Sequence, residues 1–343
     1  MVPTLLLMED GLLSNYNSVS KIIIIGAGEL GSRHLQGLTT INQKISITVL
    51  DPSPLALKKA EKRYNEIPKS KFIKKIEFIN SMNLIESSVD LAIFATNADI
   101  RSTVIQNFLS KYFAKYIIIE KIAFQSIKDF KKISSILNEK KIKAWVNCPR
   151  RTFPFFAKLK ERTIKSSKVH LSVEGSKWGL ACNSIHFLDT LAFLSDQTDF
   201  FISDSNYEKK IFNSKRDGFL ELSGMLIAES KRGDILNILD NRSAQIPFKI
   251  SIHFDDIIVE IDQNNGIVKE FHKSESKDYI KEDYPLFLQS DLTGIQVEQI
   301  IKNNFSELTS LKESYKLHVP LIKSFNQHFS LVMNKNITVC PIT

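Results

Sequence analysis

The sequence has few of the residues that cross-link a chain or keep it flexible. Its three cysteines, Cys148, Cys182 and Cys340, form no CxxC pair and are odd in number, which argues against a disulfide framework and a zinc site. Glycine and proline contribute only 12 and 10 of the 343 residues, too few for long flexible linkers. We therefore expect a protein of the reducing cell interior, the cytoplasm, with no structural metal.

Long hydrophobic runs and export signals are missing as well. No stretch approaches the roughly 18 consecutive apolar residues that a membrane helix requires. The apolar run at 5–8 is too short for the core of a signal peptide, and no basic residue precedes Lys21. We expect residues 1–20 to be an N-terminal extension, and no membrane partner.

The charge is unbalanced, with 46 basic against 38 acidic residues and a net charge of +8. Only nine of the basic residues are arginine. Lysine lacks the forked guanidinium with which arginine donates two parallel hydrogen bonds to a guanine edge or a phosphate. The lysines are interleaved with acidic residues in the segments 57–75 and 129–143, which are typical of solvated helix faces. We expect no nucleic-acid partner; a nucleic-acid binder would lose affinity steeply with salt. The charge has at most a steering role toward anions.

From residue 21 the chain repeats a short Ile- and Val-rich run, a turn and a longer amphipathic segment. This alternation predicts βαβ units around a buried parallel sheet. The expected strands are at 21–26, 45–51, 76–80, 91–96, 116–121 and 144–148. Six strands within about 130 residues are typical of a dinucleotide-binding domain, which we place at 21–148.

A G-x-G-x-x-G motif links the first expected strand to the first helix. Its first glycine permits a tight turn, its second lets the backbone approach a pyrophosphate, and its third allows close helix packing. The unpaired N–H groups of the helix then face the anion. The expected cofactor loop consists of Gly26, Ala27, Gly28, Glu29, Leu30 and Gly31.

Asp51 ends the second expected strand, 20 residues after Gly31. A carboxylate at this place accepts hydrogen bonds from the adenosine ribose and repels a 2′-phosphate. The segment 52–54 offers no arginine to bind such a phosphate, so NAD is favoured over NADP. An Asp that forms a turn before proline remains the alternative.

The carboxyl ends of the fourth and fifth expected strands would border the nicotinamide, because open parallel sheets bind ligands there. These ends carry Thr96 and Asn97, and Glu120 and Lys121. Desolvation beside a cofactor would lower the pKa of Lys121 and make it a competent proton donor or acceptor. A lysine that reaches out to solvent is equally consistent with this position.

The pattern changes after residue 148. Helices are expected at 154–165, 182–194, 287–303 and 308–333, and period-2 runs fill 200–271, among them 219–227, 235–239, 248–254 and 257–261. Such runs with tight turns predict antiparallel strands with one open face. The predicted fold is α/β, with an N-terminal Rossmann doubly wound parallel sheet and an α+β domain with a largely antiparallel sheet. That second domain would span 149–333, followed by a tail at 334–343.

These features resemble the glucose-fructose oxidoreductase / inositol dehydrogenase / MocA (Gfo/Idh/MocA) family over nearly the whole chain. The glycine loop is followed by a histidine, strand five ends in the first two residues of an E-K-P motif, and an arginine-x-x-proline opens the second domain. A later helix carries a histidine and an aspartate three residues apart. The matching residues are Gly26 to Gly31 with His34, Glu120 with Lys121, Arg151 with Pro154, and Asn183 to Asp189 with His186.

The resemblance implies NAD(P)-dependent hydride transfer on a sugar, with Lys121 and His186 jointly moving the proton. It implies Arg151, Asn183 and Asp189 as substrate-binding residues, and a homodimer or homotetramer formed through the C-terminal sheet. The chain departs from the family pattern at two positions: Ile122 replaces the proline of E-K-P, and Cys182 replaces a common aspartate.

The consequences of these departures differ. Proline has no chemical role, so we expect its loss to cost little. A thiol does not act as a carboxylate does, so we expect Cys182 to pack in the helix rather than act as a nucleophile. Asn183 is then a candidate to replace the missing substrate contact.

The net reaction stays open at this point. A sensor that binds dinucleotide or sugar without catalysis, and an epimerase or lyase that works through a transient ketone, are alternatives to a dehydrogenase. The segment 284–293 resembles family members encoded for bacterial surface polysaccharides, which suggests an activated or acidic sugar as the substrate.

Overall fold

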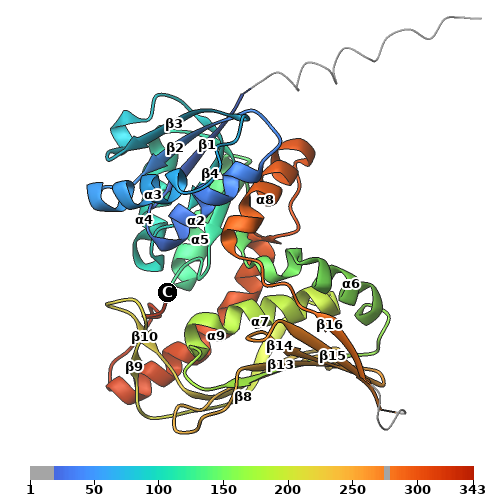
Figure 1. Ribbon diagram of the computed structural model, residues 1–343. Coiled ribbons are helices and arrows are strands. Elements are labelled where there is room, and N and C mark those ends of the chain that lie inside the picture. The colour runs from blue at the N-terminus through green and yellow to red at the C-terminus, as the bar shows by residue number, and fades with distance from the viewer. Residues whose placement is uncertain (1–18, 274–278) are drawn as a thin grey trace, which may run out of the picture.

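The computed structural model describes residues 19–273 and 279–343, so the expected extension lies almost wholly outside the described residues. Two β-sheets, one parallel and one largely antiparallel, are separated by a layer of helices (Figure 1). Within the described part, no helix is long and apolar enough to cross a membrane.

The first sheet contains the six expected parallel strands in the order β6-β5-β4-β1-β2-β3, and β17 joins it at the β6 edge. The strands are β1 (Ser20–Ile25), β2 (Ile45–Leu50), β3 (Ile73–Ile79), β4 (Val89–Phe94), β5 (Ala114–Glu120) and β6 (Lys143–Asn147). The residues of β1 from Ile22 to Ile25 are at most 3% exposed, because helices cover both faces of the sheet. The strand order reverses between β1 and β4, which places the crevice of such a sheet there.

Helices on the two faces bury separate apolar clusters. Ile22 and Ile24 point toward α2 (Glu29–Gly37), α3 (Pro54–Asn65) and α8 (Gln289–Asn303), whereas Ile23 and Ile25 point toward α4 (Ala98–Lys111) and α5 (Ile127–Glu139). The cluster under α4 and α5 continues into the second half of the molecule. The two halves therefore share one core.

Residues 289–310, which the sequence analysis assigned to the second domain, return to the first sheet. A Cβ on Gly294 of α8 would lie 2.7 Å from the carbonyl oxygen of Gly37 at the end of α2, so the two helices cross in close contact. The strand β17 (Thr309–Ser310) then pairs antiparallel with β6. Local periodicity contains no information about this return, because the contacts that cause it are more than 150 residues apart.

The second sheet has the order β16-β15-β14-β13-β7-β12-β11-β8, and only the β7–β12 pair is parallel. The strands are β7 (Val169–Gly175), β8 (Phe200–Tyr207), β11 (Gly224–Ser230), β12 (Ile235–Asp240), β13 (Lys249–Phe254), β14 (Ile257–Asp262), β15 (Ile267–His272) and β16 (Tyr279–Asp283). A separate hairpin is formed by β9 (Phe212–Asn213) and β10 (Leu220–Glu221). The strand expected at 219–227 is divided into β10 and β11, and Gly224 at the start of β11 has φ 121° and approaches Asn206 too closely for a side chain.

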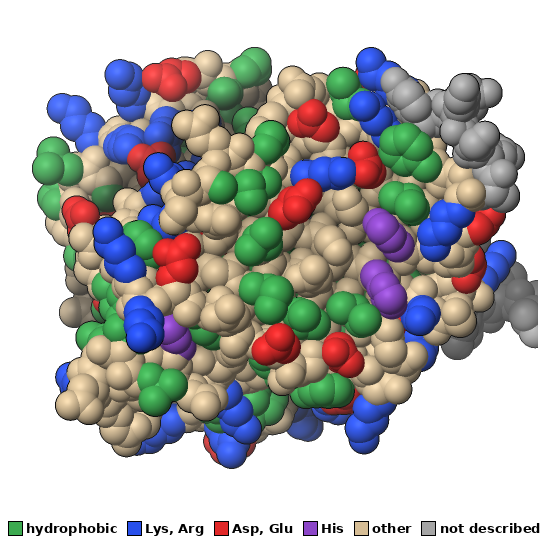
Figure 2. Space-filling model, turned by 90° about the horizontal axis from the view of Figure 1, so that it is seen from below, with side chains coloured by type: hydrophobic (Ala, Val, Ile, Leu, Met, Phe, Trp, Pro, Cys, Tyr) green, Lys and Arg blue, Asp and Glu red, His purple; other side chains and the backbone are tan. Residues whose placement is uncertain are grey.

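Helices α6 (Pro154–Thr163), α7 (Leu180–Ser195) and α9 (Leu311–Met333) lie between the two sheets and cover one face of the second (Figure 1). The other face is open, and Figure 2 shows hydrophobic side chains across it, interspersed with acidic and histidine side chains, while lysine and arginine side chains lie mostly around the border. Ile227, Ile235 and Leu239 on this face are half-buried, whereas their strand neighbours that face the helices are buried. The open face thus has an apolar centre.

The segment 334–343, expected to be a tail, turns inward. The backbone N–H of Cys340 donates to the Gln125 carbonyl at 2.8 Å, and the N–H of Leu220 donates to the Pro341 carbonyl at 2.7 Å. Cys340 and Ile342 are at most 1% exposed. This segment therefore joins the loop after β5 to the β9–β10 hairpin.

Helix α9 contributes a buried histidine to the same loop. His318 is 1% exposed, and its Nε2 accepts the Ala123 N–H at 3.3 Å while its Nδ1–H donates to the Ser314 carbonyl at 2.8 Å. Burial lowers the pKa of His318 to about 4. The folded state thus keeps this imidazole neutral where the unfolded chain takes up a proton.

We expect the free energy of unfolding to fall as the pH drops through the window from about 6.5 to about 4, because the unfolded state binds the additional proton there. His318 alone should account for a loss of about 2 kcal/mol between pH 7 and pH 5. Urea unfolding at both pH values measures this. His318→Gln should show a smaller pH dependence than the wild type; equal dependence in the two proteins would contradict the assignment.

Candidate active site

The glycine loop leaves open space at the N-terminus of α2. Gly26 has φ 101°, and a Cβ there would lie 2.8 Å from the Ala95 carbonyl carbon. A Cβ on Gly31 would lie 1.7 Å from the Gly26 oxygen, whereas one on Gly28 would meet nothing within 4 Å. Gly26 and Gly31 are therefore required by packing, and Gly28 leaves room for a ligand to approach the backbone. Ala27 is fully buried beneath the loop, and Leu30 is half-buried.

Asp51 connects this loop to the second strand. Its Oδ2 accepts the Ala27 N–H at 2.7 Å, and its Oδ1 accepts the Ser53 N–H at 2.8 Å. The carboxylate thus makes the contacts of a turn-forming aspartate, which is one of the two roles that the sequence allows for Asp51. Each oxygen keeps a further lone pair, so the ribose contacts of the other alternative remain compatible.

The Glu29 side chain points away from the loop toward α3. Arg63 donates to its carboxylate at 2.6 Å, and Lys59 donates to the other oxygen. These hydrogen bonds, from Lys59 first and then Arg63, lower the pKa of Glu29 to about 2. The charge of Glu29 is thus balanced by two cations that the motif did not reveal, and only its backbone belongs to the expected anion site.

One buried guanidinium holds the ends of β4 and β5 together. Arg101, on α4, is 1% exposed. Its Nη1 donates to the carbonyls of Glu120 at 2.7 Å and Ala123 at 3.1 Å, and also to that of Ile122, while its Nη2 donates to the Thr96 carbonyl. Four backbone acceptors beside the crevice are thereby satisfied by one side chain.

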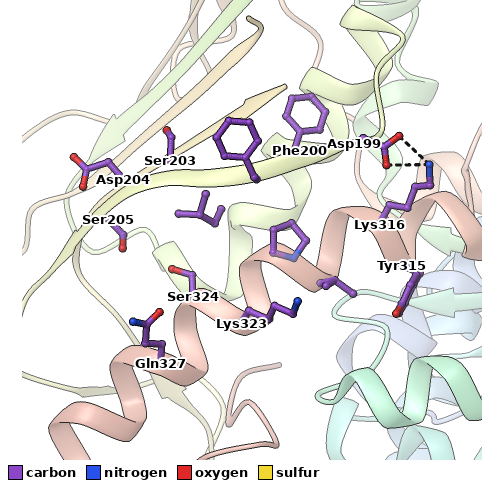
Figure 3. Close-up of a pocket in the computed structure, with 14 residues that line it drawn as sticks. Asp199, Phe200, Ser203, Asp204, Ser205, Tyr315, Lys316, Lys323, Ser324 and Gln327 are labelled. Atoms are coloured by element: carbon purple, nitrogen blue, oxygen red, sulfur yellow. Dashed lines mark hydrogen bonds and ion pairs between the residues drawn. The ribbon is translucent and has the colours of Figure 1, made fainter. Parts of the chain in front are cut away.

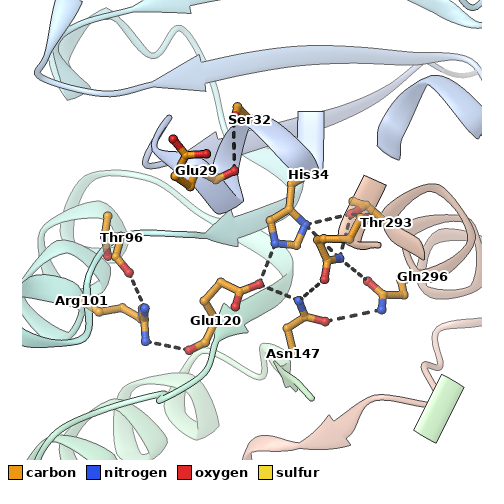
Figure 4. A network of polar contacts seen from close by, with 10 residues as sticks. Glu29, Ser32, His34, Thr96, Arg101, Glu120, Asn147, Thr293 and Gln296 are labelled. Carbon is orange, nitrogen blue, oxygen red and sulfur yellow. Dashed lines mark hydrogen bonds and ion pairs between the residues drawn. The ribbon is translucent and has the colours of Figure 1, made fainter. Parts of the chain in front are cut away.

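The side chain of Glu120 belongs to a buried polar network (Figure 4). His34 Nε2–H donates to its Oε1 at 2.8 Å, and Asn147 Nδ2 donates to the same oxygen at 2.6 Å. Burial alone would raise the pKa of Glu120, but these hydrogen bonds hold it below its ordinary value. The network reaches α8 through Gln289, Thr293 and Gln296.

Thr96 and Asn97 lie where the fourth strand ends. The Thr96 hydroxyl is buried and has no hydrogen-bond partner among the described residues. Asn97 is exposed at the N-cap of α4, and its side chain makes no capping hydrogen bond. Both polar side chains are therefore available to a ligand in the crevice. Together with the space over Gly28, they fit a dinucleotide.

Lys121 follows Glu120 and meets the first turn of α7. Its Nζ donates to the Cys182 carbonyl at 3.1 Å and lies 3.5 Å from Asn183 Oδ1. Burial lowers the pKa of Lys121 from its ordinary value. The peptide bond between Lys121 and Ile122 is cis. Of the two alternatives from the sequence, the structure has a lysine that points inward rather than out to solvent.

The start of α7 is held by a carboxylate that the sequence did not indicate. Glu221, on β10, is 3% exposed and accepts the N–H groups of Ala181 at 2.5 Å and Cys182 at 3.3 Å. Burial raises the pKa of Cys182 to about 12, so its sulfur is a thiol at neutral pH. A packing role agrees with that state.

His186 lies one turn further along α7 and faces the same space as Lys121. Burial, and then the positive charges of Lys121 and Arg150, lower the pKa of His186 well below its ordinary value. Its Nδ1 is buried and has no hydrogen-bond partner in the described part of the chain. At neutral pH His186 is therefore an uncharged imidazole.

A cavity of about 460 Å³ opens beside these residues. It is lined by polar, aromatic and basic side chains of α7, the second sheet and the loops above it: Arg150, Trp178, Asn183, His186, Phe187, Lys215, Phe248, Gln263, Asn264 and Leu286. Asn183 and His186 were expected here from the resemblance. Arg150 and the three aromatic residues were not expected in the site, although Arg150 is adjacent to Arg151 and Phe187 lies within the segment 183–189.

Arg151 and Asp189 do not line this cavity. The Arg151 Nε and Nη2 atoms donate to the two carboxylate oxygens of Asp189 at 2.9 and 3.0 Å, and Thr309 donates to Oδ1 as well. Asp189 is 1% exposed. The two side chains form a buried ion pair that fixes α7 against η4 (Pro149–Thr152) and β17, and their expected substrate contacts stay a prediction.

Among the other hollows of the described residues, one of about 470 Å³ is lined by Arg151, with Thr152, Phe193 and Glu307, and by neither Lys121 nor His186. The one in Figure 3, of about 750 Å³, lies between β8 and α9 and is lined by Asp199, Lys316 and their neighbours. Within the described residues there is no group of three His, Cys, Asp or Glu side chains placed to hold a metal ion. The cavity beside His186 is therefore the candidate substrate site.

No family model matches the sequence, and no curated protein does. Solved structures match over most of the chain. A Gfo/Idh/MocA family oxidoreductase from Vibrio cholerae is 14% identical, with a TM-score of 0.67 over 92% of this chain and 100% of that one. The chain has the fold of the Gfo/Idh/MocA oxidoreductases.

Two further structures of this fold have named substrates or ligands. UDP-N-acetylglucosamine 3-dehydrogenase from Acidithiobacillus ferrooxidans is 12% identical, with a TM-score of 0.65 over 89% of this chain and 96% of that one. The WlbA dehydrogenase from Bordetella pertussis, in complex with NADH and UDP-GlcNAcA, is 11% identical, with a TM-score of 0.63 over 90% of this chain and 96% of that one. At these identities the likeness is one of fold.

Within this fold, Arg101 offers a direct test of what holds the crevice together. Arg101→Met would leave four strand-end carbonyls without their donor, so we expect a loss of about 3 kcal/mol or more in the free energy of unfolding. Arg101→Lys should recover only part of it, because an ammonium lacks the fork.

Urea unfolding measures both variants. Arg162→Met is the matched control: Arg162 is exposed, and its ion pair with Glu270 should contribute about 1 kcal/mol or less. Equal losses for Arg101→Met and Arg162→Met would show that the buried guanidinium is not what holds the strand ends.

Proposed function

We propose that the protein is an NAD-dependent oxidoreductase that moves a hydride between nicotinamide and a hydroxyl or keto carbon of a sugar. The proposal is carried by the placement of Lys121 and His186: Lys121 Nζ lies 3.5 Å from Asn183 Oδ1, and Asn183 and His186 both line the cavity. Lys121 comes from the end of β5 and His186 from α7, and the charge of Lys121 acts on the pKa of His186. A cation and a neutral base beside one cavity suit the chemistry of a carbinol.

The dinucleotide would be held by the backbone of the loop from Gly26 to Gly31, by Asp51, and by Thr96 and Asn97. Bound NAD supplies the hydride acceptor, and NADH the donor, at C4 of the nicotinamide. Glu120 acts indirectly, because the hydrogen bonds to its carboxylate fix the end of β5, which carries Lys121.

The proton of the sugar hydroxyl needs a base when the carbinol is oxidised. His186 lines the cavity and is uncharged at neutral pH, so its imidazole accepts the proton as the hydride leaves. The ammonium of Lys121 stabilises the alkoxide character of the same oxygen. Asn183 orients Lys121 through its Oδ1. In the reductive direction His186 returns the proton.

The cofactor choice and the substrate class are parts of the same proposal. Asp51 favours NAD over NADP, because a carboxylate repels the 2′-phosphate. An activated or acidic sugar of bacterial surface polysaccharides is the substrate class that the segment 284–293 suggests. The neighbours named for UDP-sugars support that class. Epimerisation or elimination would begin with the same hydride transfer.

We also propose that residues 21–148 form the cofactor domain and that copies associate through the open face of the second sheet. Its apolar centre would be covered in a homodimer or homotetramer. A cytoplasmic setting remains part of the proposal, since three buried cysteines without a disulfide suit a reducing compartment.

Lys121→Met tests the catalytic assignment. We expect kcat to fall by about 10³-fold or more, because the alkoxide loses its cation, while the Kd of NADH changes less than about threefold. A sugar found in a screen at the NADH absorbance band serves as substrate, and fluorescence titration gives the Kd. Lys128→Met, on α5, is the control. A nearly normal kcat in Lys121→Met would refute the assignment.

Asp51→Asn tests the cofactor preference. The substitution removes the charge and leaves an oxygen for the Ala27 or Ser53 N–H, so the loop should keep its shape. We expect affinity for NADH to fall about tenfold and affinity for NADPH to hold or rise, as measured by fluorescence titration of both. An equal loss for the two cofactors would contradict a role in discrimination.

A further inference from the structure

The candidate substrate cavity is basic. Of the side chains that line it, Arg150 and Lys215 carry positive charge, and none is Asp or Glu. Lys215 is exposed on the loop between β9 and β10, whereas Arg150 is largely buried. A substrate that enters this cavity therefore meets two cations without a carboxylate to neutralise them.

Arg150 and Arg151 are adjacent, and only one of them has a counter-ion. Arg151 makes a two-point ion pair with Asp189. Arg150 has no carboxylate within ion-pair distance among residues 19–273 and 279–343; its Nη2 donates to Gln263 Oε1 at 3.3 Å, and the hydroxyl of Tyr284, a neutral phenol, also interacts with the guanidinium. An arginine keeps its proton at neutral pH, so this buried charge is left for a ligand.

The surroundings of Arg150 hold its guanidinium in one place. Its plane lies over the ring of Phe187, 4.7 Å from the centroid. Phe187 in turn packs against Trp178 and Phe248, with ring centroids 5.5 and 6.2 Å away. A guanidinium fixed on an aromatic wall presents its cavity-facing edge in a constant direction, which suits a planar anion.

Arg150 also lies close to the proposed reaction centre. It lines the same cavity as His186, and its charge is one of those that lower the pKa of that imidazole. An anion bound to Arg150 would therefore belong to the ring that is oxidised. The diphosphate of a nucleotide sugar would extend away from the reacting ring, toward the exposed Lys215.

We propose that the substrate carries a carboxylate on the sugar ring and that Arg150 binds it. This inference rests on the proposed function and narrows its substrate to acidic sugars. The forked guanidinium matches a carboxylate with two parallel hydrogen bonds, and the aromatic wall packs against the C–H groups of the ring. Lys215 adds attraction at the entrance.

Matched sugars test the proposal. Glucose, galactose and mannose are each compared with the corresponding uronate, free and as nucleoside-diphosphate conjugates, by calorimetric titration of the protein saturated with NADH. The fluorescence of Trp178, in the cavity wall, gives a second readout. We expect at least one uronate to bind about tenfold or more tightly than its neutral partner, with or without the nucleotide. No preference for a uronate in any pair would overturn the inference.

Variants then assign the preference to its residue. Arg150→Gln should abolish the preference for the uronate and leave the affinity for the neutral sugar within about threefold. Arg150→Lys should retain part of the preference, and Arg162→Gln, outside the cavity, should retain all of it. An Arg150→Gln protein that loses affinity for the nucleotide conjugates yet still prefers uronates would show that Arg150 binds the diphosphate, and would overturn the inference.

The same titrations separate this inference from the proposed function. Failure of the wild-type protein to bind NADH would refute the proposed function itself. Binding of NADH and turnover of neutral sugars, without a preference for any uronate, would overturn only the carboxylate proposal.

Discussion

The architecture of the site depends on the hydrogen bonds that Arg101 donates to the ends of β4 and β5. Strands of a parallel sheet end with carbonyls that have no partner in the next strand, and in a crevice these acceptors are costly unless a donor reaches them. Arg101 binds the carbonyls of Glu120, Ile122 and Ala123 and that of Thr96. Lys121 lies between two of these fixed residues. The backbone hydrogen bonds of its neighbours thus set the inward direction of the Lys121 side chain, independently of the contacts that this side chain makes itself.

Glu120 links the strand ends held by Arg101 to the rest of the molecule. Its carbonyl accepts from Arg101, and its carboxylate accepts from His34 on the glycine-loop helix and from Asn147 on β6. Helix α8 closes the same network from a segment much later in the chain. The helix that follows the glycine loop, the end of β5 and the returning helix α8 are therefore held by one set of buried hydrogen bonds, in which every member depends on the others being in place.

The features that sequence could predict are those set by near neighbours. Runs such as 22–25 and the glycine spacing of 26–31 report local burial and local backbone geometry, and the strands and the open space over Gly28 follow from them. The counter-ions do not follow in this way. Glu29 meets Lys59 and Arg63, and Asp189 meets Arg151 and Thr309, only because separate elements pack together. The return of α8 to the first sheet and the inward course of 334–343 are also long-range packing outcomes.

The arginine pair at 150 and 151 shows why residue type alone does not assign a role. Both side chains are the same, and the resemblance singled out Arg151. The chain then places Asp189 within reach of Arg151, so that its charge is neutralised in the scaffold. Arg150 instead faces a cavity with an aromatic wall and no carboxylate lining it. A buried cation can act on a ligand only where the fold provides no counter-ion, and the lining of the cavity beside His186 provides none.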